Sequence, residues 1–468
     1  MEHKPVPLSP GGQVLFSLGS ASFTMLERLL ILYVPFYYLP PGEYGVPNLV
    51  PEETFWGVAT ILGAAFLAGR VLDAVADPLV AAMSDGSSSP LGRRKLFLLL
   101  SALPLAATAA LVFFPPARGE ESVLNGVWLG VMLCFFYIFF TAYVNPYLAL
   151  ISELGHTGEQ RINLSTLIAL LGLVGMVLVT VGLPELVGRW QLKGMEFRES
   201  FRWAVLGISL LSLFLLYLAT FSFKESRNCY AVKAHSIRVW ESLKKTYAVR
   251  PFRVFLMGEV FLQFAMNITT LGLMYYAVVL FKQDQRFMSL LAALTIGAAL
   301  LSFPFVNVTA KKVGKKKVIL TGALLLALCS AAIFSFSFNL TGVYYYGGLS
   351  MFALAGIPLA ILTILINPTI ADLARAEAIR EGEGREAMFF GARAVLLKLI
   401  IALAGVVFAF LLSAFGKDIA NPLGVQLSIL AVTLASICGC FFFACYPEKE
   451  VLASLEQRSK FGPGQDSR

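Results

Sequence analysis

The chain contains 468 residues, of which 57% are hydrophobic and 14% are charged, and its mean hydropathy is +0.75. Soluble domains carry about 25% charged residues, so this composition excludes a soluble globular protein and predicts an all-α polytopic membrane protein. The formal net charge of +8 does not indicate nucleic-acid binding, because the basic residues lie in short loops between apolar runs.

Twelve apolar stretches are long enough to cross a bilayer, which takes about 20 residues. They cover approximately 12–39, 55–83, 95–115, 123–152, 162–184, 201–222, 252–281, 286–309, 316–337, 342–373, 389–415 and 423–445. A polar, basic segment separates the first six from the last six. We therefore predict a six-helix bundle over 1–222, a cytoplasmic linker with an amphipathic helix over 223–250, a second six-helix bundle over 251–445 and a cytoplasmic tail over 446–468.

The loops alternate in charge along the chain. The segment 40–54 contains three Glu and no Lys or Arg, whereas the segments 84–95, 224–250 and 309–317 are basic. By the positive-inside rule, this pattern predicts a plasma (inner) membrane protein with both termini in the cytoplasm. The loop 185–202 disagrees, because it contains four basic residues among three acidic ones on the opposite side.

The second apolar stretch contains a stripe of charge. Arg70, Asp73 and Asp77 stand at i, i+3 and i+7, so they share one face of a helix, and Pro78 follows directly. Ionisable groups inside a bilayer are costly and usually mark an ion or substrate path. The one carboxylate in excess suits a site for Na⁺ or H⁺, and the alternative is an Arg–Asp cluster that only packs helices together.

A weak internal repeat supports two parallel halves. The string SDGSSSPLGRRK (84–95) follows the second helix and TAKKVGKKK (309–317) follows the eighth, each a helix end, a Gly and a basic cluster. Together with the twelve helices and the basic central segment, the D-x(6)-G-R-R-K string at 85–95 resembles the major facilitator superfamily. The string R-x-x-D-x-x-x-D-P at 70–78 is similar to that of the glycoside–pentoside–hexuronide:cation symporters, to which the sodium-dependent lysophosphatidylcholine symporters are related.

The resemblance implies roles for particular residues. Asp73 and Asp77 would bind the coupling cation, and Lys398, from the eleventh helix, would lie across the cavity near them. Arg70 would be a neighbour of the aspartates that contributes to substrate binding or charge balance. Lys398 stands about ten residues inside its apolar stretch, which argues for a cavity, although a lysine that snorkels to the interface is the alternative.

Further polar residues are candidates of two kinds. Substrate-binding candidates are Glu27, the N-P-Y residues Asn145 and Tyr147, Glu259 and Asn267. A purely structural role is the alternative for Glu27, and helix-to-helix hydrogen bonding is the alternative for Glu259 and Asn267. Gating candidates are Asp85, Arg93, Arg94 and Arg161, with a purely topogenic basic cluster as the alternative.

The expected function is secondary active transport. We predict symport of a small organic solute, a sugar or glycoside, with Na⁺ or H⁺, by alternating access between the two bundles. A lysophospholipid or other amphipathic or anionic solute is the alternative, since the stretches LGSASF (18–23) and YVNPYLAL (143–150) lack the carboxylates by which sugar-carrying members bind hydroxyls. A channel or membrane enzyme fits less well. We expect no cofactor beyond the coupling ion, no nucleic-acid partner and a monomer in the lipid bilayer.

Overall fold

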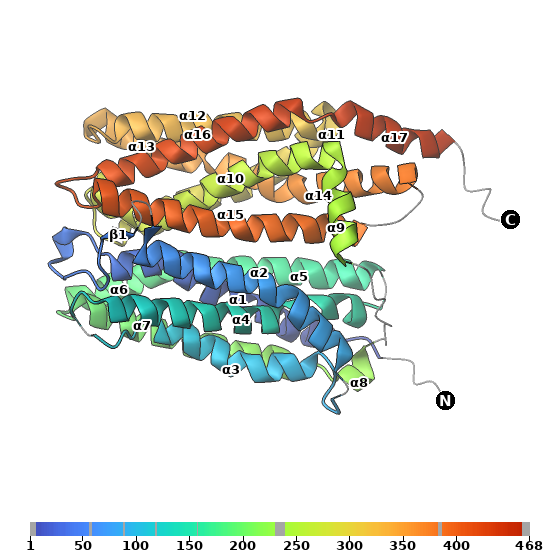
Figure 1. Cartoon of the computed structure of the whole chain (residues 1–468), viewed down its shortest axis with the longest axis horizontal. Coiled ribbons are helices and arrows are strands. Elements are labelled where there is room, and N and C mark those ends of the chain that lie inside the picture. Colours follow the sequence, from blue (N-terminus) through green and yellow to red (C-terminus); the bar gives the residue numbers. More distant parts are fainter. Residues whose placement is uncertain are drawn as a thin grey trace. The chain divides into compact units, whose positions relative to one another are not determined.

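The computed structural model describes residues 6–55, 59–87, 89–117, 119–156, 158–229, 239–381 and 386–460 (Figure 1). These residues divide into two compact units, each of which is described by itself. Unit 1 comprises Met1–His235, Thr270–Ala292 and Gly405–Val425, and unit 2 comprises Ser236–Thr269, Ala293–Ala404 and Gln426–Arg468.

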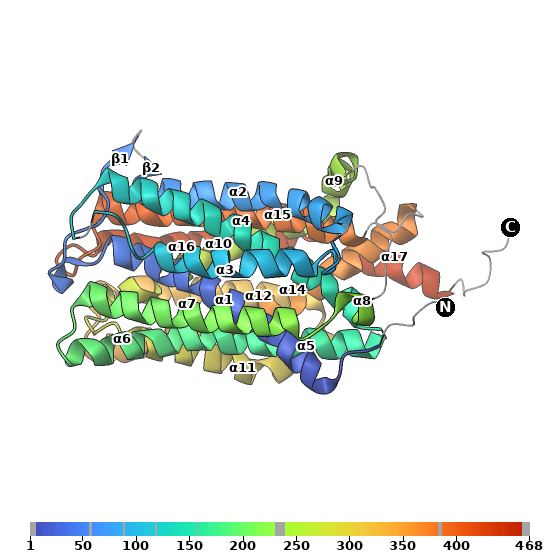
Figure 2. The ribbon, with the colours of Figure 1, turned by 90° about the horizontal axis from the view of Figure 1, so that it is seen from below.

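Unit 1 is built on the first half of the chain. Its elements are α1 (Pro10–Tyr38), η1 (Gly42–Tyr44), the antiparallel pair β1 (Thr54–Phe55) and β2 (Ala59–Thr60), α2 (Ile61–Gly86), α3 (Lys95–Leu111), α4 (Val123–Leu154), α5 (Gly158–Val177), the π-helical turn η2 (Leu178–Gly182), α6 (Leu183–Leu192), α7 (Phe197–Phe221) and α8 (Glu225–Asn228). Helix α1 packs against α5 and α7, and α4 packs against α2 and α3 (Figure 2).

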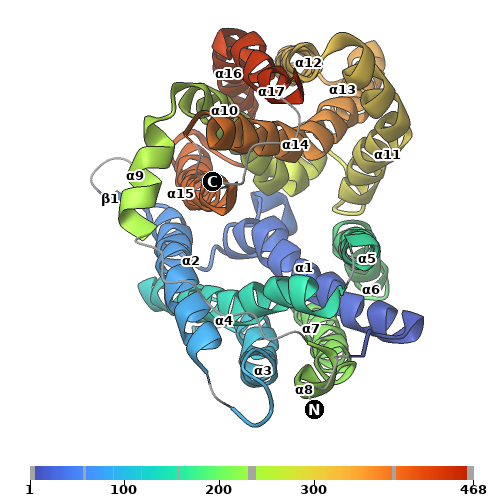
Figure 3. The same cartoon turned by 90° about the vertical axis from the view of Figure 1, so that its right-hand side faces the viewer.

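The second half of the chain supplies the other helices. They are α9 (Val239–Ala248), α10 (Arg250–Tyr275), the π-helical turn η3 (Tyr276–Leu280), α11 (Phe287–Val313), α12 (Lys315–Phe336), α13 (Gly342–Leu354), α14 (Gly356–Glu381), α15 (Glu386–Phe415), α16 (Leu423–Cys445) and α17 (Glu448–Lys460). Within unit 2, α12 packs against α13 and α14, and α14 packs against α17 (Figure 3).

Buried tyrosines hold the end of α1 in place. Tyr33, Tyr37 and Tyr38 are fully buried, and their hydroxyls donate hydrogen bonds to the carbonyls of Val179, Phe113 and Val112 at 2.8, 2.9 and 2.6 Å. A tyrosine combines a large apolar ring with one polar group that needs a partner when buried. These three residues therefore fix α1 against the ends of the neighbouring helices without leaving a hydroxyl unsatisfied.

Ten helices among the described residues are long and apolar enough to cross a membrane. Two more of the predicted twelve correspond to α3, which has 17 residues, and to α2, which carries the Arg70, Asp73 and Asp77 charges in its middle. The all-helical membrane fold predicted from the sequence is thereby confirmed. The boundaries differ in places: the fifth stretch continues through η2 to Leu192.

The tenth predicted stretch, 342–373, is divided in two. Helix α13 ends at Leu354 and α14 begins at Gly356, with Ala355 between them. A Cβ at position 356 would lie within 2.8 Å of the backbone nitrogen of Ala299 and closer still to the carbonyl oxygen of Thr295. The break thus stands where a glycine lets two backbones approach each other, a feature that hydropathy does not reveal.

Candidate cation-binding site

The charged face of α2 packs against a polar stripe on α4. On α2, Asp73 and Asp77 stand four residues apart, and on α4, Thr141 and Asn145 do the same. Residues at i and i+4 lie one above the other on a helix, so two such pairs on packed helices meet side chain to side chain. The side chains of Asp73, Asp77, Thr141 and Asn145 therefore form one row of oxygen-bearing groups, the polar ladder, between α2 and α4 in unit 1.

Thr141 joins the two aspartates. Its Oγ1 lies 2.6 Å from Oδ1 of Asp73 and 3.3 Å from Oδ1 of Asp77, while Nδ2 of Asn145 donates to the same Asp77 oxygen at 3.0 Å. Asp73 is buried, with 1% of its surface exposed, and Asp77 is half-buried. Three oxygens therefore converge within a membrane helix pair, which is the donor type that hard cations prefer.

Arg70 contacts Asp73 at the end of the polar ladder that is nearer the start of α2. Its Nη1 lies 3.5 Å from Oδ2 of Asp73, and its Nη2 lies 3.3 Å from Oε1 of Glu27 on α1. The guanidinium also stacks over the ring of Tyr137, with 4.3 Å between Cζ and the ring centroid. Arg70 is 4% exposed and Glu27 is half-buried. These contacts bring together α1, α2 and α4 and orient the second carboxylate oxygen of Asp73.

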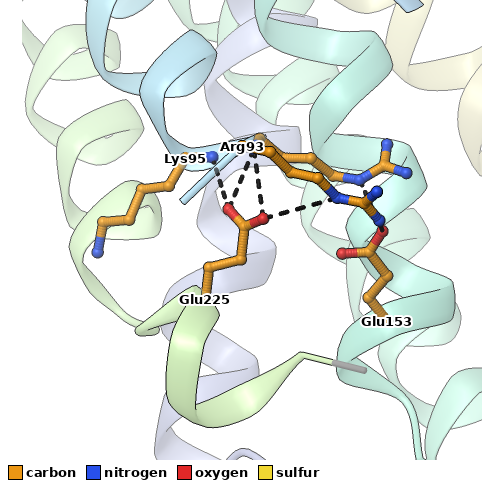
Figure 4. A network of polar contacts seen from close by, with 5 residues as sticks. Arg93, Lys95, Glu153 and Glu225 are labelled. Atoms are coloured by element: carbon orange, nitrogen blue, oxygen red, sulfur yellow. Dashed lines mark hydrogen bonds and ion pairs between the residues drawn. The ribbon is translucent and has the colours of Figure 1, made fainter. Parts of the chain in front are cut away.

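A second charge network lies at the start of α3 (Figure 4). Nη2 of Arg93 and Nε of Arg94 lie 2.6 and 2.7 Å from Oε1 of Glu153, which is buried at the end of α4. The carboxylate of Glu225 accepts hydrogen bonds from the backbone N–H groups of Arg94 and Lys95 at 3.1 and 3.0 Å. Glu225 thus caps the N-terminus of α3, where backbone N–H groups have no partner within the helix.

The gating cluster predicted from the sequence included Asp85, whose side chain lies outside the described part of the chain, but neither Glu153 nor Glu225. Arg161 instead donates from Nε to the carbonyl of Gly155 at 3.0 Å and so closes the end of α4.

Burial raises the pKa of the nearby Cys229 thiol, and the charges of Glu153 and Glu225 raise it further. That cysteine is therefore protonated and weakly nucleophilic at neutral pH.

A family model described as MFS/sugar transport protein matches residues 15–446. The chain belongs to this family. It is a multi-pass membrane protein of the glycoside–pentoside–hexuronide:cation symporter type, a family of transporters and not of enzymes.

Individual relatives are distant. The chain is 23% identical over 294 residues to the inner membrane symporter YicJ of Escherichia coli (strain K12), covering 62% of this chain and 59% of that one. It is 23% identical over 314 residues to the isoprimeverose transporter of Lactiplantibacillus pentosus, covering 66% and 61%. The matches thus span about three fifths of either relative. The crystal structure of the nucleoside transporter NupG (D323A mutant) superposes with a TM-score of 0.65 at 12% identity, covering 93% and 99% of the two chains, which shows a shared fold.

The remaining predicted site residues of this symporter lie in two places. Tyr147 is fully buried in unit 1, where its hydroxyl donates to the carbonyl of Phe16 at 2.9 Å and its ring stacks on that phenylalanine. Asn267 donates to the carbonyl of Gln263 one turn earlier, at 2.7 Å, and Lys398 is half-buried, both within unit 2. Their roles toward a substrate stay predictions.

Glu259 has a partner that the sequence analysis did not anticipate. In unit 2 its carboxylate accepts hydrogen bonds from Nε of Arg393 at 2.7 and 2.9 Å and from Nη2 at 2.5 Å, which joins α10 to α15. Glu259 is 1% exposed. A bidentate pair of this geometry fixes two helices and makes the arginine unavailable as a separate charge. Arg393 stands 134 positions after Glu259, so the pair forms only through the packing of α10 on α15.

Proposed function

We propose that this symporter binds its coupling cation, Na⁺ or H⁺, at Asp73, Asp77 and Thr141 and uses it to drive uptake of a sugar or glycoside by alternating access. The observation that carries the proposal is the position of the Thr141 hydroxyl between the two aspartate carboxylates, at 2.6 and 3.3 Å. A bound cation would replace the hydroxyl proton as the group that the carboxylates share, while Asn145 holds Asp77 in position at 3.0 Å. The description of the family and the name of the isoprimeverose transporter support a sugar or glycoside as the solute.

The substrate side of the proposal needs ligands other than the carboxylates expected from sugar-carrying members. In the stretch 18–23, Gly19 faces Tyr147, and a Cβ at this position would stand 2.7 Å from the tyrosine ring. Ser20 donates to the carbonyl of Ile168 on α5 at 2.7 Å. This part of α1 therefore serves packing. The sugar hydroxyls would be bound by other polar residues, among which we propose Glu27 and Arg70 of unit 1.

Transport into proteoliposomes tests the cation site. Asp73→Asn and Asp77→Asn each remove a carboxylate charge but keep the side-chain size, and we expect both to abolish accumulation driven by a Na⁺ or H⁺ gradient. Asp284→Asn is the matched control, because Asp284 lies in the loop before α11 and pairs with Arg286 at 2.9 Å. Cation-driven accumulation that persists in both helix variants would overturn the assignment.

A solute screen tests the substrate. Purified protein is titrated with mono- and disaccharides, glycosides and lysophospholipids in a thermal-unfolding assay, with and without Na⁺. A cation-dependent stabilisation by a sugar or glycoside supports the proposal. Stabilisation by lysophospholipids alone would assign the protein to amphipathic solutes. In the proteoliposome experiment, solute uptake that stops when the inner and outer concentrations are equal would indicate a channel.

A further inference from the structure

A cavity of about 830 Å³ lies at the end of unit 1 where α1 and α3 finish and α7 begins. It is therefore at the opposite end of α3 from the Arg93–Glu153 network. Its wall combines aromatic, cationic and anionic side chains: Tyr44, Phe114, Phe197, Trp203, Arg198, Arg202, Glu196 and Glu199. None of these residues takes part in the proposed cation site.

The cations of the cavity lie deeper than the anions. Arg198 is 8% exposed and Arg202 is half-buried, whereas Glu196 and Glu199 are exposed at the rim. Arg198 donates from Nη2 to the carbonyl of Pro47, and Arg202 donates from Nε to the hydroxyl of Tyr37 at 3.1 Å. These bonds fix both arginines to the backbone and the packed core of unit 1, and not to a carboxylate.

One polar atom of the cavity lacks a partner. Nε of Arg198 is buried and has no hydrogen-bond partner among the described atoms. The start of α7 is adjacent, and the side chain of its N-cap, Glu196, makes no capping hydrogen bond. A buried donor without an acceptor is costly, and a helix N-terminus attracts negative charge. The positive charge of the Arg198 guanidinium, which lines the cavity, and the adjacent start of α7 both favour an anionic group within the cavity.

The position of the cavity indicates where this acceptor comes from. On α7, Trp203, Leu210, Phe214 and Phe221 are 55%, 64%, 61% and 64% exposed, and their spacing places them on one face of the helix. An exposed apolar stripe on a membrane helix faces lipid, and a tryptophan near the helix start is typical of the headgroup level. The cavity therefore lies beside lipid at the depth of the phosphates.

We propose that this cavity binds the headgroup of a zwitterionic phospholipid, with the phosphate on Arg198 and Arg202 and the ammonium between Glu196, Glu199 and the aromatic wall. The two arginines and two glutamates sum to zero charge, so a headgroup with one negative and one positive charge leaves no charge uncompensated. Tyr44 and Trp203 can face the ammonium by cation–π contact. The same interpretation accounts for Arg198 and Arg202, two of the four basic residues of the loop 185–202, which disagrees with the charge pattern of the other loops.

The test measures lipid binding by the delipidated full-length protein. Its thermal unfolding midpoint is titrated with short-chain phosphatidylethanolamine, with phosphatidylglycerol of the same chain length and with soluble phosphoethanolamine. We expect phosphatidylethanolamine to stabilise the protein most. Arg202→Gln should weaken its apparent affinity about tenfold, the loss expected for one charge-assisted hydrogen bond.

Two further variants make the result specific. Glu196→Gln combined with Glu199→Gln, both at exposed positions, should abolish the preference for phosphatidylethanolamine over phosphatidylglycerol while phosphatidylglycerol binding persists. Lys193→Gln, an exposed residue of the same loop outside the cavity wall, is the control and should change neither titration. The proposal is overturned if Arg202→Gln binds both lipids like the unchanged protein, or if phosphoethanolamine without acyl chains stabilises as strongly as the lipid.

Discussion

At the scale of single residues, Thr141 is the residue that links the two aspartates of the proposed cation site. Its hydroxyl hydrogen bonds with Asp73 and Asp77, at 2.6 and 3.3 Å. Thr141→Val keeps the shape of the side chain and removes the oxygen, so we expect the half-saturating cation concentration to rise about tenfold, the effect of one lost charge-assisted contact. Thr141→Ser retains the oxygen and should transport almost normally.

The control for this prediction is a buried threonine outside the site. Thr108 on α3 is 7% exposed and bonds to the carbonyl of Pro104 in its own helix at 2.7 Å. Thr108→Val should leave the cation dependence of uptake unchanged. If Thr141→Val also transports with an unchanged cation dependence, the hydroxyl is a packing group and the site consists of the carboxylates alone.

Residues on α2 were accessible to sequence analysis because charges are rare inside membrane helices. Arg70, Asp73 and Asp77 stand out because a charged side chain inside an apolar stretch costs free energy in a bilayer and so indicates a function. Thr141 and Tyr137 do not, since threonine and tyrosine are ordinary residues in such helices and only the packing of α2 on α4 shows which ones matter. Glu259 was identified as polar and buried, but its partner Arg393 lies 134 positions later, and no local pattern links two residues so far apart.

At the scale of elements, the weak repeat of the sequence corresponds to two similarly built turns. Gly92 and Gly314 both have positive φ, at +109° and +97°, and each precedes a helix whose first N–H groups are capped by a distant glutamate. In unit 1 this glutamate is Glu225, and in unit 2 it is Glu448, whose Oε1 accepts from the backbone N–H of Lys316 at 2.8 Å.

The turn at Gly314 allows the contribution of the Glu448 cap to the stability of the protein to be measured. Glu448→Gln weakens the cap of α12, and we expect a loss of about 1 kcal/mol, the value typical of a removed helix cap. The measurement is the thermal unfolding midpoint of the purified protein, which should fall by a few degrees.

Glu450→Gln is the matched control for the cap. It makes the same charge change two residues later on α17, where the side chain is exposed. A drop of equal size in both variants would show that the net charge of α17 and not the cap determines the effect. The sequence suggested the two turns through their glycine and basic residues, but it could not reveal the caps, because each glutamate follows its turn by more than a hundred residues.

At the scale of the whole chain, unit 1 includes two segments from the second half of the sequence. In the loop after α15, Lys417 forms an ion pair with Glu52 from the loop after α1. Beside it, the backbone N–H of Ile419 donates to Glu43 at 2.5 Å, and that of Gly42 donates to Asp418 at 2.6 Å. Lys417 is 5% exposed, so this tie is partly shielded from water.

Breaking this tie should make the adjacent end of unit 1 easier to open. We expect Lys417→Gln to raise the rate at which a cysteine introduced at Tyr38 reacts with a membrane-impermeant thiol reagent, because Tyr38 is fully buried near the end of α1. The charge-reversed pair Glu52→Lys with Lys417→Glu should restore the low rate. Glu53→Gln, at an exposed neighbouring position, serves as the control. A labelling rate that is equal in all four proteins would show that the ion pair does not hold this end closed.

The chemistry of these loop contacts has a consequence for how the adjacent end of unit 1 opens. They consist of one ion pair and two carboxylate hydrogen bonds to backbone N–H groups, so separating them exchanges protein partners for water and uncovers little apolar surface. Contacts of this kind lose strength as ions screen them, with a Debye length of about 8 Å at physiological ionic strength. We therefore expect a cysteine at position 38 to react faster as the ionic strength at this face rises, whichever ion drives uptake.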